Sequence, residues 1–205
     1  MTSHGKLSTT QFILHPNQWF PTILWSALAA TAVVIVLYLM LVLVARPPRM
    51  LRKRWSWWEK LVYIATLITV AILGTTSFYS VLRYGGMHGW WLFAHMCGAG
   101  AFLAVLPLLA LTWFRANRFG AHAEGPIDPM SDYAPRFFWL PKFTFWLIVI
   151  GGFMVSASML VSMLPLFGTD TLEELLAIHR YSGLLVVVAT LLHFYSVLLE
   201  RAGLR

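Results

Sequence analysis

The chain has 205 residues, of which 59% are hydrophobic and only 11% are charged, and its formal net charge is +7. Soluble domains carry about 25% charged residues, so this composition excludes a soluble globular protein and indicates an integral membrane protein. Cys97 is the only cysteine, which excludes internal disulfides, CxxC zinc sites, iron–sulfur clusters ligated by this chain and the CxxCH attachment of a c-type haem.

Five apolar segments are long enough to cross a membrane, since a helix needs about 20 residues to span the hydrocarbon. They are expected near residues 22–45, 60–82, 90–114, 142–164 and 176–199. The predicted fold is therefore an all-α bundle of five transmembrane helices. We divide it into residues 1–54, which hold an extra first helix, and residues 55–205, a four-helix core. The residues before the first span lack a basic cluster and no small-residue cleavage site follows, so no cleaved signal peptide is expected.

The basic residues predict the orientation of the chain, because short loops rich in Lys and Arg stay in the cytoplasm. Five spans put twelve of them on one side and only Lys6, Arg83 and Arg180 on the other. The twelve are Arg46, Arg49, Arg52, Lys53, Arg54, Lys60, Arg115, Arg118, Arg136, Lys142, Arg201 and Arg205. We expect a multi-pass protein of a bacterial-type inner membrane, with its N-terminus outside and its C-terminus cytoplasmic. This asymmetry accounts for the positive charge, together with contact to membrane lipid, so no nucleic-acid partner is needed.

Two histidines lie inside the last span, in HRYSGLLVVVATLLH. His179 and His193 are fourteen residues apart, which on a helix is about 21 Å of rise and leaves both on one face. This geometry suits two haems stacked across a bilayer, and Gly183 leaves room for a flat ring one turn after His179. The alternative is that each histidine is a polar residue satisfied by a neighbouring helix.

A haem held by two imidazoles needs a second histidine at the same depth. In GMHGWWLFAHMCGAGAF, His95 has the depth expected for His179, and Gly98 and Gly100 follow it. His88 falls outside the span and is interpreted as an interface residue. Arg180 is expected either to bind a haem propionate or to extend to the interface as a snorkelling arginine.

In the order of these segments the chain resembles the cytochrome b gamma subunit of respiratory formate dehydrogenases and the related diheme cytochrome b subunits of nickel-iron hydrogenases. The resemblance covers about residues 55–201. It rests on ILGTTSF, then GWWLFAHMCGAGAF with one histidine, then FTFWLIVIGGFMVSASML with none, then HRYSGLLVVVATLLHFY with two. It implies that His95 and His179 ligate an outer haem b as metal-binding residues, and that His193 ligates an inner one.

The sequence departs from the family where the inner haem would take its other ligand. The family has a histidine at the cytoplasmic start of the helix WSWWEKLVYIATLITVAILG, and Lys60 stands at about that position here. Either the inner haem is absent, or a different side chain completes it, or a partner subunit does. The other side chains considered are those of Met40, Met50 and His122. We expect a haem at His193 with a second ligand that is either not a histidine or distant in the sequence.

The resemblance implies an electron-transfer subunit of a quinone-linked respiratory oxidoreductase rather than an enzyme by itself. Electrons would pass from a periplasmic catalytic subunit with an iron–sulfur partner, through haem b, to quinone. The edge WSWWEK, near Lys60 and His193, is the candidate quinone end. The alternatives are a structural or assembly subunit without redox function, in which histidines link helices, and a proton-coupled transporter component.

Overall fold

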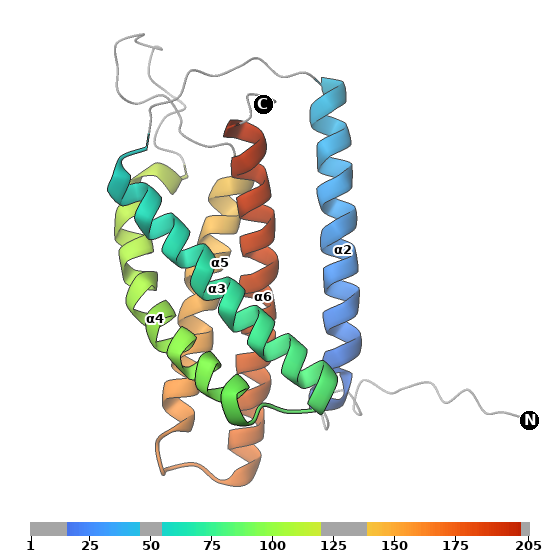
Figure 1. Cartoon of the computed structure of the whole chain (residues 1–205), viewed down its shortest axis with the longest axis vertical. Helices are drawn as coiled ribbons and strands as arrows, with labels where there is room; N and C mark the ends of the chain where they lie inside the picture. Colours follow the sequence, from blue (N-terminus) through green and yellow to red (C-terminus); the bar gives the residue numbers. More distant parts are fainter. Residues whose placement is uncertain (1–15, 46–54, 120–138, 202–205) are drawn as a thin grey trace, which may run out of the picture.

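The computed structural model describes residues 16–45, 55–119 and 139–201, and five long helices account for most of them (Figure 1). All five are long and apolar enough to cross a membrane, which confirms the predicted all-α transmembrane bundle. A helix satisfies its backbone hydrogen bonds internally, as the bilayer interior requires. The helices are α2 (Pro16–Ala45), α3 (Trp57–Tyr84), α4 (Gly89–Trp113), α5 (Trp139–Ser162) and α6 (Thr169–Arg201), with a 3₁₀ turn, η1 (Arg115–Asn117), after α4.

Local signals set the ends of α3. Ser56 caps its first turn by accepting a hydrogen bond from the backbone N–H of Glu59, whose carboxylate accepts one from the Ser56 N–H in return. Gly85 ends the helix with φ of 72°, a conformation that glycine adopts without strain. The last helix begins earlier than predicted, at Thr169. Its first turns carry acidic residues, so a criterion based on apolar runs leaves them out.

Helices α3 to α6 form two antiparallel hairpins, α3–α4 and α5–α6, whose members pack closely along their length. The hairpins meet through α3 against α6 and α4 against α5, so α4 and α6 stand diagonally opposite each other in the four-helix core. At the contact between α4 and α5, a Cβ added to Gly152 would lie 2.9 Å from Leu106 and 3.0 Å from Phe102. The absence of a side chain at Gly152 therefore sets how closely these two helices approach.

Helix α2 stands outside the four-helix core and packs mainly on α6 (Figure 1). Phe20 and Leu24 are fully buried against Leu184 of α6, while Tyr38 stacks edge-on against Tyr195 further along. Between these contacts an apolar groove of about 500 Å³ lies among α2, α3 and α6. At membrane depth this groove is open to lipid hydrocarbon.

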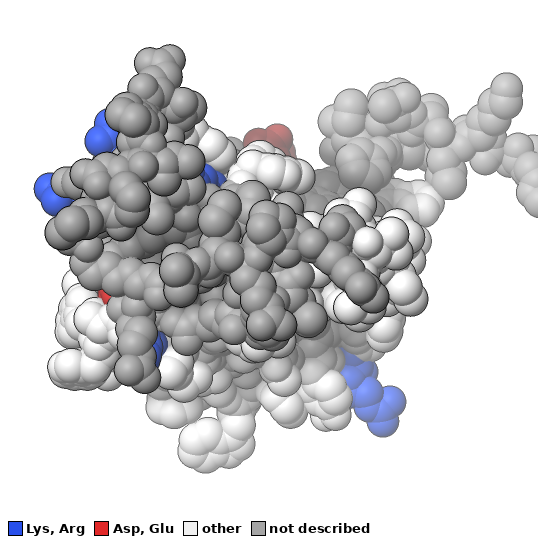
Figure 2. All heavy atoms as spheres, turned by 90° about the horizontal axis from the view of Figure 1, so that it is seen from above, with Lys and Arg blue, Asp and Glu red and all other residues white. Residues whose placement is uncertain are grey.

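Charged side chains divide between the two ends of the bundle. The end where α3 and α5 begin carries Lys60, Arg115, Arg118 and Lys142, and the visible part of the described surface there shows Lys and Arg side chains at its edge (Figure 2). The opposite end carries Asp170, Glu173 and Glu174 at the start of α6, together with two arginines, Arg83 and Arg180. Helix α2 begins at this acidic end, whereas α6 finishes at the basic end, so the described part of the chain crosses the bundle an odd number of times.

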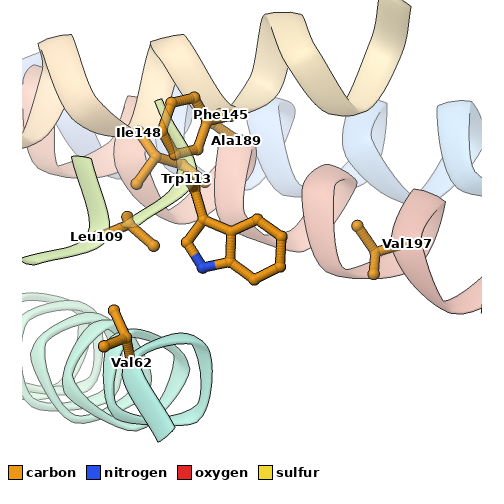
Figure 3. Close-up of a cluster of buried hydrophobic side chains, with 7 residues drawn as sticks. All are labelled: Val62, Leu109, Trp113, Phe145, Ile148, Ala189 and Val197. Carbon is orange, nitrogen blue, oxygen red and sulfur yellow. The ribbon is translucent and has the colours of Figure 1, made fainter. Parts of the chain in front are cut away.

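The core of the basic end is a dense apolar cluster. It consists of Val62, Leu109, Trp113, Phe145, Ile148, Ala189 and Val197, each at most 3% exposed. The Trp113 indole lies at its centre, between side chains from α3, α5 and α6 (Figure 3). Small polar side chains are buried at both ends, among them Thr76, Ser80, Ser158 and Ser182 toward the acidic end and Thr66, Thr144, Asn117 and Ser196 toward the basic end.

Candidate functional site

Two of the predicted site residues, His95 and His179, lie against each other near the acidic end of the bundle. His95 comes from α4 and His179 from α6, the diagonally opposite helix, and their ring centroids are 6.3 Å apart with the rings inclined at 71°. The structure thus brings together the pair that the sequence predicted from matched depth. Both rings are largely shielded from solvent by the surrounding helices.

Each ring is anchored through Nδ1 to a helix that is not its own. His179 Nδ1 lies 3.0 Å from the carbonyl oxygen of Val155 on α5, and since a carbonyl only accepts, this nitrogen carries the proton. His95 Nδ1 lies 3.0 Å from the hydroxyl of Thr76 on α3, whose own proton goes to the Ile72 carbonyl at 2.7 Å. That hydroxyl therefore accepts from His95, and the Leu73 carbonyl is a further backbone partner of the ring.

These anchors leave an unprotonated Nε2 on both His95 and His179. Within the described part of the chain, neither ring makes a hydrogen bond through Nε2. Two such nitrogens cannot hydrogen-bond to each other, because both are acceptors. Imidazoles that ligate a metal through Nε2 have this arrangement, with Nδ1–H donated to a carbonyl or another oxygen.

The spacing of the two rings fits one metal ion between them. A metal–nitrogen bond to histidine is about 2 Å and the nitrogen lies about 1 Å from the ring centre, so two imidazoles on opposite sides of one iron have centroids about 6 Å apart. The observed centroid distance is 6.3 Å. Ser80, one turn after Thr76 on α3, is fully buried with its hydroxyl unpartnered, so this end is not closed by apolar packing. The donor set at His95 and His179 therefore fits a haem with two axial imidazoles.

His193, further along α6, is anchored to α5 in the same way. Its Nδ1 lies 3.1 Å from the Pro141 carbonyl and 3.1 Å from the Thr144 hydroxyl. Pro141 and Val155 are fourteen residues apart on α5, and His179 and His193 are fourteen residues apart on α6. Because the two helices are antiparallel, one alignment of α5 against α6 places a carbonyl beside each histidine. Nε2 of His193 is again left as an acceptor.

The surroundings of the His193 ring do not fit a porphyrin. His193 lies next to the apolar cluster of Figure 3, and the cavity beside its ring is only about 10 Å³. The ring of Tyr63 on α3 lies 5.9 Å from that of His193, centroid to centroid. Lys60, the predicted second ligand, is exposed one turn earlier on α3.

Of the other ligands considered for His193, only Met40 lies within the described residues, and it is not beside His193. Met40 is 57% exposed on α2, outside the four-helix core. Met50 and His122 lie outside the described residues. Among the side chains that the structure describes around His193, we find no second axial ligand.

Arg180 and the glycines have other neighbours than those predicted. The Arg180 guanidinium lies over the ring of Phe20 on α2, 5.9 Å from its centre. Gly98 lets α4 approach α3, since a Cβ there would come within 3.1 Å of Ile72. Gly100 has no neighbour within 4 Å, and a Cβ at Gly183 would lie 3.7 Å from Val155. Gly98 is thus a helix-packing residue here, whereas Gly100 and Gly183 have space beside them.

Sequence reasoning missed the residues that orient the histidines. Nothing in their residue type distinguishes Thr76 and Thr144 from other helix residues. The anchors on Val155 and Pro141 are backbone carbonyls, which every residue has, so the sequence cannot identify them. The threonines alone had a usable signal, because each lies near the end of an apolar span at the depth of a histidine.

Across the described ranges no group of three or more His, Cys, Asp or Glu side chains lies together as a metal site. Two axial haem ligands form no such group, because the porphyrin nitrogens complete the coordination. In comparisons with protein-family models, with curated proteins and with solved structures, nothing matched this chain.

Proposed function

We propose that this chain is a membrane cytochrome b subunit in which His95 and His179 hold one haem b. The observation that carries the proposal is the pair of imidazoles from α4 and α6, 6.3 Å apart, with both Nδ1 protons used elsewhere. A structural histidine pair would use one ring as donor to the other, and this pair has no such donor. The resemblance to the gamma subunits of formate dehydrogenases supports the same two residues.

A bound haem b supplies reversible one-electron transfer. The protein holds each imidazole in one orientation, through Val155 for His179 and through Thr76 for His95. Proton donation from Nδ1 to these oxygens makes Nε2 a better electron donor to a metal. The surrounding helices keep bulk water away from the site, so its reduction potential depends on the two axial ligands and their hydrogen bonds.

The chain alone offers no substrate chemistry, so we propose partners on both sides of the electron path. The donor is an iron–sulfur protein with its catalytic subunit, which would dock at the acidic end near His95 and His179. The acceptor is quinone, which reaches the lipid-facing helices through the membrane. Among the described residues no carboxylate is buried within a span, which disfavours a proton-coupled transporter.

The proposed orientation places the basic end of the bundle in the cytoplasm of a bacterial-type inner membrane. Lys60, Arg115, Arg118 and Lys142 support it, because basic loops stay on the cytoplasmic side. Reporter fusions at the two termini test this directly. A cytoplasmic N-terminus, or two termini in one compartment, would contradict it.

The haem proposal is tested by the visible spectrum of the purified protein and by its haem content. We expect reduced-minus-oxidised bands of low-spin haem b. His95→Ala and His179→Ala should each abolish them while the protein still folds. His88→Ala is the matched control, since this histidine is exposed before α4 and contacts the ring of Tyr84. A wild-type protein without haem, or full haem retention in both variants, would refute the proposal.

A further inference from the structure

Asn117 is a buried polar residue to which the proposed function gives no role. It ends η1, is 1% exposed, and donates from Nδ2 to the Trp113 carbonyl at 3.0 Å. Reversing the amide would turn its oxygen toward that carbonyl, so this hydrogen bond fixes the orientation. The side-chain Oδ1 is buried and has no hydrogen-bond partner. An orphaned acceptor of this kind is costly unless a small molecule satisfies it.

Asn117 and His193 line the same small cavity. The cavity is about 10 Å³, and its other walls are Trp55, Tyr63, Leu109, Trp113 and Phe145. His193 contributes the acceptor Nε2, because its Nδ1 proton is directed at the Pro141 carbonyl. Two acceptors that line one cavity cannot satisfy each other, so the occupant must donate two hydrogen bonds.

Only a very small molecule fits this space. A cavity needs about 10–15 Å³ to hold one water molecule, and a water can donate both of its protons. No carboxylate lines the cavity, so nothing there would balance a cation. We propose that one buried water molecule donates to His193 Nε2 and Asn117 Oδ1, and that this water site stands where an inner haem would otherwise lie.

The aromatic walls explain why the site is closed to a larger group. Trp55 and Trp113 have centroids 4.5 Å apart, and Trp55 and Tyr63 have centroids 5.1 Å apart, in edge-to-face contacts. Trp113 is 3% exposed and fills the space between four helices (Figure 3). A porphyrin against His193 would have to displace this indole and the apolar cluster around it. His193 is therefore a structural histidine, and the chain carries a single haem.

The haem count rests on the proposed function, whereas the water site does not. Two measurements separate them. The first is the ratio of haem to polypeptide in wild-type protein, in His193→Gln and in Asn117→Leu. The second is a structure of the wild-type protein at a resolution that shows ordered water. Asn117→Leu removes the Oδ1 acceptor and leaves His193 unchanged, so it serves if His193→Gln fails to fold.

We expect one haem per polypeptide in all three proteins and a density peak between His193 Nε2 and Asn117 Oδ1. Two haems in wild type, or one fewer after the change at His193, would overturn the assignment of His193. One haem with no density between the two residues would overturn the water site. A protein without haem but with that density would support the water site and refute the proposed function.

Discussion

Each half of α6 holds one histidine. The two histidines make the same hydrogen bond to α5, but the side chains around the rest of their rings differ. His179 donates to the Val155 carbonyl and His193 to the Pro141 carbonyl, each through Nδ1. Elsewhere around the rings, His179 contacts the ring of His95, whereas His193 contacts the ring of Tyr63 and lines a cavity the size of one water. The repeated histidine on α6 therefore determines only the hydrogen bond to α5. The side chains of the facing helices determine whether the histidine can bind a metal.

The apolar part of the packing differs between the two sites. Buried polar side chains lie at both, Thr76 and Ser182 at the His95–His179 pair and Thr144 and Ser196 at His193. His193, in addition, shares a cavity with Trp113 and other members of the apolar cluster. Dense packing leaves no room for a cofactor, because interiors of this kind contain few voids larger than a water.

The largest expected effect comes from crowding the contact between the two hairpins. In Gly152→Ala the new methyl would lie 2.9 Å from Leu106 and 3.0 Å from Phe102, so these two side chains of α4 must shift. Overpacking of this kind costs about 1–3 kcal/mol of unfolding free energy. Because His95 lies on α4, its distance from His179 should change and haem content should fall. The His193 anchor lies within the α5–α6 hairpin and should survive.

Gly100→Ala is the matched control for Gly152→Ala, since a Cβ at Gly100 has no neighbour within 4 Å. Thermal stability and haem content of the two variants are compared in the same detergent. Equal behaviour of the two would show that the α4–α5 contact does not set the distance between His95 and His179.

A smaller effect is expected from Thr76→Val, which removes the hydroxyl that accepts from His95 Nδ1. Loss of such an outer partner weakens metal binding by about 10- to 100-fold. The Leu73 carbonyl remains as a partner, so we expect the lower end of that range. Haem titration of the haem-free protein measures the change.

Thr144→Val makes the equivalent change at His193, where the Pro141 carbonyl remains as a partner. It should leave haem affinity unchanged. If it weakened haem binding as much as Thr76→Val does, the distinction between the two histidines would be wrong.

The smallest effect is expected from Arg180→Gln. The guanidinium over the Phe20 ring contributes about 0.5–1 kcal/mol as a cation–π contact between α6 and α2. Its loss should lower thermal stability slightly and leave the haem spectrum and reduction potential unchanged. Arg83→Gln, at an exposed position near the end of α3, is the control. A shift in reduction potential specific to Arg180→Gln would instead favour the predicted contact with a propionate.

The sequence was sufficient to predict the five spans, because a helix satisfies its own backbone hydrogen bonds in lipid and needs an apolar run of about 20 residues to cross it. It was also sufficient to pair His95 with His179 by depth, since the rise along a helix is fixed. The depth of a residue in the membrane, however, does not show in which direction its side chain faces around the helix. The family resemblance put Lys60 at the position of the missing ligand for His193, whereas the residue whose ring contacts His193 is Tyr63, which faces inward on the same helix.

The surroundings of His193 were not predictable for a related reason. Trp113 and Asn117 come from the end of α4 and from η1, and an apolar span gives no amphipathic pattern that would show which face is buried. The residues that line the cavity beside His193 come from different helices, so their proximity is visible only in the folded structure. The start of α6 was misplaced because its first turns extend beyond the hydrocarbon.

The position of α2 bears on how this protein is made. Helix α2 leaves the ribosome before α3 to α6, yet its main contacts are with α6, the last of the five described helices. Phe20 has an early partner in Phe78 of α3, 6.5 Å away between ring centroids, but Leu184 of α6 joins this cluster only after α3 to α5 have been made. Helix α2 is therefore inserted before most of its docking surface exists, as expected when insertion precedes helix association. The synthesis of α6, rather than the insertion of α2, is the event that closes the described bundle.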